Sequence, residues 1–413
     1  MSRGRLVLSI ALAFASVAGT SAAVLSPQAA YAAEKKTVSA KLAPSLGEAQ
    51  KLMQSRKYAD ALKKLQEADA VQGKTPYEEY IIAEMRGACN QQLGKYTEAA
   101  KAYETTLASG QLSGDALVKR QVLLAQLYMN ANNTPKAIEL GNKVLASNPN
   151  NLDMQVLVGQ SYYQKNDYAN AAKLIGGAVS SAERSGRKPD ENWIQILMSC
   201  YFKQGNMAAY TPTVEKMVRY YPKPNYWNDL GRGLLNSNGI TDTQSLDVRR
   251  LMMDVGAAKD ARDYTEFAET ALLKNAAGEA KTALEAGYKA NILGKGATAD
   301  REKRLLDTAT AKSAAAVAAL PAADTAAQGQ PTGKADVAVG EVYLGNGDYQ
   351  KAVTAFERGL GKGGVDDVDG TKLHLAQAYA KLNQKAKAIS LLKGITTKGL
   401  NADIARVWLI HLQ

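Results

Sequence analysis

An alanine recurs once every 33 to 39 residues along most of this 413-residue chain, and this period limits the fold more than any other feature. In four copies it stands three residues after a tyrosine that closes a short polar turn, as in Gly94-Lys95-Tyr96. The alanines are Ala61, Ala99, Ala137, Ala171, Ala280, Ala352 and Ala388, and Tyr210 and Thr243 fill the slot in two poorer copies. Such a period is typical of stacked helix pairs, because one pair cannot bury its apolar face alone.

One step of the series is longer than the others. From Ala280 to Ala352 the chain runs 72 residues, which is twice 36. We therefore expect one degenerate repeat between Lys289 and Gly333.

The composition favours an all-α fold. Alanine, leucine, lysine and glutamine are plentiful, and all of them favour helix. Eleven prolines are few for this length, and 46% apolar residues are enough to form a core. Long runs of alternating β-branched residues are missing, so we expect no sheet.

Fragments of a known pattern accompany the alanines. The clearest are Trp227, Leu230 and Gly231 in one copy, and Gly340, Tyr343, Tyr349, Ala352 and Phe356 in another. In these residues the chain resembles the bacterial exported tetratricopeptide repeat (TPR) proteins. The resemblance covers about Ala43–Leu293 and Ala335–Gln413. It implies a right-handed superhelix of helix-turn-helix units, with about nine recognisable repeats plus one degenerate copy.

The expected organisation has four parts. These are a signal peptide at 1–32, an N-terminal TPR array at 43–293, a degenerate helical segment and linker at 294–333, and C-terminal TPR repeats with a capping helix at 334–413. Pro321 is expected to end an alanine-rich helix, so that Ala322–Gly333 forms a hinge or linker. The terminal helix, about Ala402–Leu412, carries one apolar stripe and should cap the stack.

The N-terminus has the pattern of a secretory signal. Arg3 and Arg5 precede the apolar run Leu6–Ala18, and Ala30-Tyr31-Ala32 provides a cleavage pattern of small residues. We expect cleavage near Ala32 and export to the periplasm of a Gram-negative bacterium. Because Leu6–Ala33 carries no charge, retention as a membrane anchor is the alternative.

The formal charge is +11, and removing Arg3 and Arg5 with the leader leaves 11 − 2 = +9. This mild excess favours acidic partners or anionic surfaces in general. It lacks the dense basic stripe, interleaved with aromatics, of a nucleic-acid binder, so we expect no nucleic-acid partner.

Cysteines and histidines are few. Cys89 and Cys200 occupy the same position of the first helix in repeats two and five, so at about 10 Å per helix layer they lie on the order of 30 Å apart. We expect buried thiols and no disulfide. His374 and His411 are expected on helix faces, with no role as metal ligands or catalysts.

Two glycine-containing loops resemble ligand sites only loosely. The run Gly359–Gly364 follows a helix and lacks the serine or threonine of a phosphate loop, so we interpret it as a helix C-cap. In the segment Asp366–Gly370 the first and last calcium-ligand positions hold Val365 and Ala376, which favours a helix N-cap. We expect no metal and no cofactor.

No arrangement of residues predicts catalysis, so the sequence indicates a non-enzymatic scaffold or adaptor of the cell envelope. The resemblance implies a partner protein held in the concave groove. The groove positions are Glu84, Gln91, Gln126, Met129, Asn130, Gln160, Tyr163, Gln164, Gln195, Phe202, Lys203, Asn228 and Arg232. Carboxamides can pair with a peptide backbone, and Met129, Tyr163 and Phe202 can act as apolar anchors.

Two other functions remain open. One is a membrane-anchored assembly factor, which requires that the leader is retained. The other is an enzyme of cell-wall turnover, which requires a further globular catalytic domain. No stretch of about 100 residues outside the repeats is free to form that domain.

Overall fold

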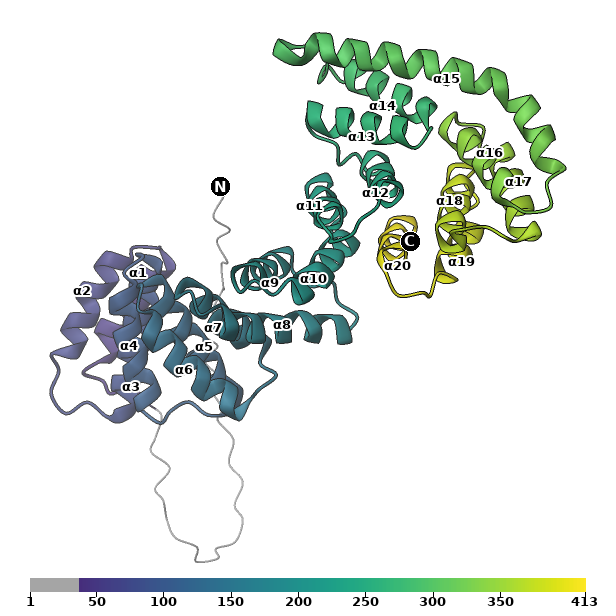
Figure 1. Ribbon diagram of the computed structural model, residues 1–413. Helices are drawn as coiled ribbons and strands as arrows, with labels where there is room; N and C mark the ends of the chain where they lie inside the picture. Colours follow the sequence, from purple (N-terminus) through teal and green to yellow (C-terminus); the bar gives the residue numbers. More distant parts are fainter. Residues whose placement is uncertain (1–36) are drawn as a thin grey trace, which may run out of the picture.

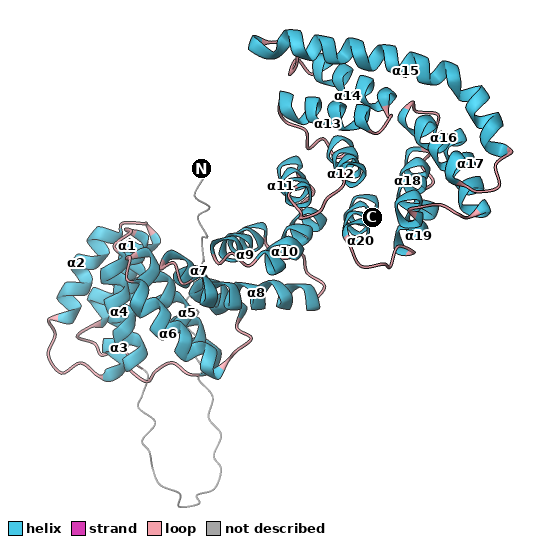
Figure 2. Ribbon diagram, in the orientation of Figure 1, coloured by secondary structure: helices cyan, strands magenta, loops and turns pink. Residues whose placement is uncertain are grey.

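The computed structural model describes residues 37–413, and the predicted signal peptide lies outside this range. The described residues form twenty α-helices, one short 3-10 helix at Gly296–Thr298 and no strand (Figure 2). Between residues 37 and 413, no helix combines the length and the apolar character needed to span a membrane. The all-α prediction is confirmed.

The helices follow one another with short connections. The first ten are α1 (Ala43–Gln54), α2 (Tyr58–Asp69), α3 (Pro76–Gln92), α4 (Tyr96–Ala108), α5 (Gly114–Asn130), α6 (Thr134–Ser147), α7 (Leu152–Gln164), α8 (Tyr168–Arg184), α9 (Glu191–Lys203) and α10 (Met207–Tyr220). The second ten are α11 (Pro224–Leu235), α12 (Asp242–Asp254), α13 (Ala261–Leu273), α14 (Ala277–Lys289), α15 (Ala299–Gln328), α16 (Lys334–Gly345), α17 (Tyr349–Lys362), α18 (Val368–Lys381), α19 (Lys385–Lys393) and α20 (Leu400–Leu412).

The recurring alanines lie where the two helices of each pair meet. All seven stand near the start of the second helix of a pair and are fully buried: Ala61, Ala99, Ala137, Ala171, Ala280, Ala352 and Ala388. A methyl group there allows the backbones to approach closely, while larger residues fill the space around it. The predicted repeat register is therefore confirmed.

A left-handed backbone residue marks the turn within each helix pair. Asparagine or glycine fills this position in most turns, for example Gly94 (φ 73°), Asn132 (φ 56°) and Asn166 (φ 61°). These residue types adopt positive φ at little cost, so they let the chain reverse within three residues. The turn chemistry, rather than the helix composition, sets where each pair folds back.

The degenerate repeat is a single 30-residue helix, α15, rather than a helix pair. Its sequence, Ala299–Gln328, contains neither glycine nor asparagine, so no residue is suited to a left-handed turn. Pro321 lies inside the helix and does not end it, which corrects the sequence prediction. Proline is tolerated where a helix bends, and α15 curves toward α16 and α17 along its second half (Figure 1).

The expected linker is held in place for much of its length. Residues 322–328 are helical, and Asp324 accepts hydrogen bonds from Arg358 (2.5 Å) and from the Tyr343 hydroxyl (3.2 Å). The ammonium group of Lys362 donates to the carbonyl oxygens of Ala327 (2.8 Å) and Gln328 (3.1 Å), the last residues of the helix. These bonds satisfy helix-end acceptors and fix α15 on α17, so only residues 329–333 connect the elements as a loop.

The molecule has two regions (Figure 1). Helices α1–α9 stack one pair on the next, and we call them the N-terminal arc. Helices α10–α20 curve back until α20 packs against α10 and α12, and we call them the C-terminal ring. The predicted capping helix therefore covers α18 and α19 and also closes the chain onto its own middle.

Candidate partner-binding surface

The first helices of successive pairs form the inner layer of the N-terminal arc. Helix α1 contacts α3, α5 contacts α7, and α7 contacts α9, whereas the second helices of neighbouring pairs lie farther apart. Because the first helices lie closer together than the second helices, the stack curves so that the first helices line its concave side. The predicted groove residues of the arc all belong to α3, α5, α7 and α9, so they lie on the inner layer.

The predicted groove residues differ in accessibility. Gln126, Asn130, Gln164, Gln195, Phe202 and Lys203 are exposed, Glu84, Gln91, Met129, Gln160, Tyr163 and Arg232 are half-buried, and Asn228 is buried. The exposed members concentrate toward the carboxyl ends of α5, α7 and α9. The surface offered to a partner therefore lies near the turns within the helix pairs.

Several groove residues link one repeat to the next. The Tyr163 hydroxyl lies 2.8 Å from the Ser199 hydroxyl, and the Gln195 amide donates to the Tyr226 hydroxyl (2.6 Å). Glu84 forms an ion pair with Arg120 (2.5 Å). These bonds hold neighbouring inner helices at a fixed angle. The same side chains therefore both shape the inner surface and form part of it.

Two predicted groove residues are used inside the fold. Asn228 is only 6% exposed, and its amide donates to the Ala257 carbonyl oxygen (2.9 Å). Arg232 donates to Asp263 (2.9 Å) and to Asn228 (3.1 Å). Both connect α11 to the segment before α13 and to α13 itself, so Asn228 is not a surface residue of the groove.

Aromatic side chains gather where α7 and α9 end. Phe202 is 60% exposed and its ring centroid lies 5.9 Å from that of Tyr210, while Met207 is 49% exposed. In the preceding repeat, Tyr163 and Tyr168 pack edge to face at 5.8 Å. We call Tyr163, Tyr168, Phe202, Met207 and Tyr210 the aromatic patch. The two halves adjoin, since the Gln204 amide donates to the Tyr168 carbonyl oxygen (2.8 Å).

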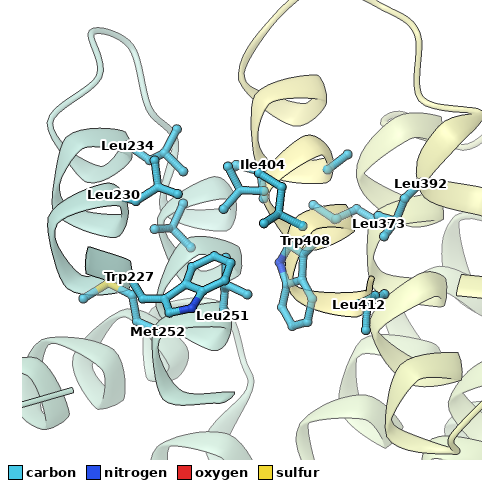
Figure 3. Close-up of a cluster of buried hydrophobic side chains, with 14 of the residues drawn as sticks. Trp227, Leu230, Leu234, Leu251, Met252, Leu373, Leu392, Ile404, Trp408 and Leu412 are labelled. Carbon is cyan, nitrogen blue, oxygen red and sulfur yellow. The ribbon is translucent and has the colours of Figure 1, made fainter. Parts of the chain in front are cut away.

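In the ring, the last helix covers a different layer, because α20 packs mainly against α10 and α12, which are second helices of their pairs. Ile404 and Trp408 of α20 are at most 2% exposed and form one buried cluster with Trp227, Leu230, Leu234, Leu251 and Met252 of α11 and α12 (Figure 3). Leu412 lies on the side of α20 toward Leu373 and Leu392. His411 packs edge-on between Trp227 (6.1 Å) and Trp408 (5.8 Å). Arg406 forms a bidentate pair with Glu215 of α10, and Gln244 of α12 donates to Asn401 (2.9 Å).

A buried charged cluster also ties α12 to α14, α16 and α18. It consists of Asp247, Arg250, Glu279, Glu341 and His374. Arg250 donates to Asp247 (2.9 Å) and to Glu279 (2.9 Å). His374 contacts Asp247 through Nε2 (3.0 Å) and Glu341 through Nδ1. Each buried charge thus has an opposite partner, which is the condition for retaining it away from water.

The sequence analysis placed His374 on a helix face and missed its partners. The residue is 5% exposed. Burial alone would lower its pKa, but Asp247 and Glu341 outweigh burial and raise the pKa of His374 to about 10. His374 is therefore protonated at neutral pH and donates from both ring nitrogens. Asp247 is 127 residues away in the chain, and no local pattern in the sequence signals the pair.

The remaining polar motifs are structural. Asp367 caps α18 by accepting from the Gly370 amide, and Gly363 (φ 71°) ends α17, so both cap predictions are confirmed. Cys89 and Cys200 are buried and unpaired with each other, and burial raises the pKa of both thiols to about 11. Within residues 37–413 no group of three or more His, Cys, Asp or Glu side chains is arranged to hold a metal ion.

A family model described as tetratricopeptide repeat matches residues 46–117, 122–185 and 337–402. The matches cover the N-terminal arc up to α8 and the last two helix pairs, where the alanine register is also clearest. The chain is a tetratricopeptide repeat protein. No curated protein sequence matches it.

Solved structures with similar helical folds include a tetratricopeptide repeat protein from Parabacteroides merdae, at 14% identity and a TM-score of 0.36, covering 82% of this chain and 99% of that one. YrrB, described as a TPR protein with an unusual peptide-binding site, has 14% identity and a TM-score of 0.35, with 46% and 89% covered. MamA from Desulfovibrio magneticus has 15% identity and a TM-score of 0.35, with 49% and 100% covered. None is similar enough to transfer a ligand.

Proposed function

We propose that this protein is a non-enzymatic scaffold that holds a partner protein on the inner layer of its N-terminal arc. The observation that carries the proposal is the contrast between a covered apolar surface in the ring and an exposed apolar group on the arc. In the ring, α20 covers the apolar side chains of α11 and α12, whereas Phe202 in the arc leaves 60% of its surface exposed. Exposed large apolar residues that are grouped and rimmed by polar groups are typical of protein-interaction sites.

The exposed side chains of the inner layer suit a peptide or protein partner. Gln126, Asn130, Gln164 and Gln195 are exposed, and each carboxamide offers both donors and an acceptor to a backbone. The fold itself supports the proposal, since tetratricopeptide repeats serve as interaction scaffolds rather than as catalytic domains. We infer a protein partner and no nucleic-acid partner.

We further propose that the protein works in the bacterial cell envelope, exported to the periplasm with cleavage near Ala32. The apolar run Leu6–Ala18 behind Arg3 and Arg5 supports export. The mass of the N-terminal peptide of the native protein tests this part. A mature chain that begins near Ala33 agrees with a free periplasmic scaffold, and a retained leader favours a membrane-anchored assembly factor.

In-cell crosslinking followed by mass spectrometry tests the main proposal. We expect one co-purifying protein to be crosslinked repeatedly to residues of α3, α5, α7 and α9. Crosslinks confined to the outer helices or to the ring would contradict binding on the inner layer.

A further inference from the structure

We infer that the aromatic patch is a docking site for an extended peptide segment that carries one aromatic or long aliphatic anchor next to an acidic residue. This inference rests on the proposed function, because it assigns a partner class to the end of the arc and to α10, the helix that follows it. It does not follow from the repeat pattern, which predicts a buried alanine, not Tyr210, at the start of α10.

The patch combines one position that two repeats share with one departure from the alanine register. Tyr163 and Phe202 stand at equivalent positions, three residues before the left-handed residues Asn166 and Gly205. In α10 the alanine slot holds Tyr210, whose ring cannot fit a space made for a methyl group. Tyr210 is consequently half-buried, and Phe202 lies against its ring, mostly outside the core.

The lysines beside the aromatic patch indicate the charge of the bound peptide. Lys165 and Lys203 flank the patch on the turn side, and both are exposed. The ion pairs of neighbouring lysines, Lys216 with Glu183 and Lys223 with Glu191, involve neither of them. The nearby carboxylate of Asp167 is engaged in capping α8, where it accepts from the amide of Asn170. Lys165 and Lys203 form no ion pair within residues 37–413, and two such cations beside an apolar patch favour an acidic residue in the ligand.

A carboxylate of α11 also lies near the patch. Asp229 of α11 is near enough to Tyr210 to help raise the pKa of the tyrosine, after the larger effect of burial. Burial also raises the pKa of the Asp229 carboxyl itself. A ligand that crosses from α9 toward α11 should therefore carry its acidic residue on the lysine side and none beside Asp229.

The rim of the patch favours a peptide over a lipid surface. Gln164, Asn166, Gln204 and Asn206 are exposed, and they can pair with the backbone groups of an extended chain. Hydrocarbon offers no such partners, so pressing this rim into a bilayer would leave carboxamides unsatisfied. The occupant that meets the apolar, cationic and carboxamide groups together is a peptide.

The chain contains a matched control for this site. Leu273 ends α13 and is 71% exposed, with Lys274 directly after it, so it repeats the Phe202-Lys203 pattern on the ring. The aromatic pairs of α7–α10 are missing from that turn. The variant Leu273→Ala/Lys274→Glu therefore changes surface hydrophobicity and charge as Phe202→Ala/Lys203→Glu does, at a place where we propose no docking site.

The test is selection from a phage-displayed library of random short peptides on the purified protein, with anisotropy measurements on the selected peptides. We expect enrichment of an aromatic or aliphatic residue within three positions of Asp or Glu. The Phe202→Ala/Lys203→Glu variant should bind these peptides at least about tenfold more weakly, and the Leu273→Ala/Lys274→Glu variant as wild type. Circular dichroism should show unchanged helicity in both.

Several results would overturn the inference. They are no enrichment, enrichment without an acidic residue, equal loss in both variants, or binding to vesicles of mixed zwitterionic and anionic phospholipid that needs the same two residues. If no library peptide is enriched while in-cell crosslinks still place a partner on α3–α9, the scaffold function stands and only the partner class is wrong. If both fail, the proposed function fails as well.

Discussion

The N-terminal arc and the C-terminal ring are both built mainly from helix pairs, yet the arc leaves an apolar group of its inner layer exposed, whereas the ring covers apolar side chains with its own last helix. In the arc each pair contacts mainly its neighbours, and the inner layer stays accessible. In the ring the chain returns on itself, and contacts join residues far apart in sequence, such as Arg406 with Glu215 across 191 residues. Repeats specify how neighbours stack, whereas closure depends on a few side chains at the two ends of the ring.

This difference has consequences for stability. A linear stack loses stability locally, because each repeat depends on its neighbours alone. A closed ring should unfold more cooperatively, since opening one contact exposes surfaces on both α12 and α20. Substitutions where α20 packs against α10 and α12 should therefore affect the whole ring, whereas substitutions in the arc should act locally.

Trp408→Ala should have the largest effect. The side chain is 2% exposed and lies where α20 packs against the middle of the chain, a contact that we call the closing interface. Its removal leaves a cavity and should lower the free energy of unfolding by about 3–5 kcal/mol. Hydrogen exchange followed by mass spectrometry should show faster exchange in α10–α12 and α18–α20, with α3–α6 unchanged. Phe202→Ala, which removes a mostly exposed ring, serves as the control. Equal acceleration in the arc would mean that the two regions are not energetically distinct.

His374→Gln should destabilise the ring by about 3 kcal/mol, because it leaves Asp247 and Glu341 with one buried cation fewer while retaining a hydrogen-bond donor. Thermal unfolding measured at pH 7 checks the magnitude. An unchanged midpoint would show that the cluster is hydrated and makes no net contribution.

The same histidine predicts a pH dependence. Its pKa is raised from the ordinary 6.5 to about 10, so the protonated form is stabilised by folding. This contribution is fully present below pH 6.5 and is lost as the pH rises toward and through 10. Urea titrations between pH 7 and 10 should show a declining stability of the ring, and the decline should be smaller in His374→Gln. A flat profile in the wild type would contradict the assignment.

A pair of glycine substitutions compares packing in the two regions. A Cβ at Gly278 would fall on the Gly345 carbonyl oxygen, where α14 approaches α16, and one at Gly141 would fall on the Val158 side chain. Overpacking costs about 1–3 kcal/mol, and Gly278→Ala should lie at the upper end because backbone must move. Amide hydrogen exchange should become faster throughout the ring in Gly278→Ala, and only within α5–α8 in Gly141→Ala.

The smallest effect is expected at the rim of the closing interface. The Arg406 side chain is 46% exposed, so its pair with Glu215 should contribute no more than about 1 kcal/mol. A double-mutant cycle with Arg406→Ala and Glu215→Gln measures the coupling, which should weaken as salt is added. A larger, salt-independent coupling would place the pair in the interior of the interface.

Much of the arc could be predicted from the sequence because its determinants are local. In the four complete pairs of the arc the alanine for close approach always recurs, and a glycine or asparagine marks every turn except the first, which has Arg56. Both features act within a few residues. The candidate binding residues of α5, α7 and α9 followed from the same register. Tyr210 was visible as a poor copy of the alanine, but its consequence, an outward Phe202, required the packing around it.

The ring could not be predicted because its determinants are distant. The apolar stripe of the last helix indicated that it packs, yet nothing in that stripe identifies α10 and α12 as the second surface. His374 and Asp247 stand 127 residues apart, and each has an ordinary local context. Pro321 misled the prediction, since its effect on α15 is offset by contacts from Arg358 and Lys362.

The closure itself can be measured directly by crosslinking Gln244→Cys on α12 to Asn401→Cys on α20 with a short bismaleimide. The native Cys89 and Cys200 are buried, so the introduced thiols should react selectively. We expect nearly complete intramolecular crosslinking in the native state, loss of it in urea, and none for a control pair of Gln92→Cys with Asn401→Cys. Two thiols that are both modified but remain unlinked would show that the chain is an open solenoid throughout.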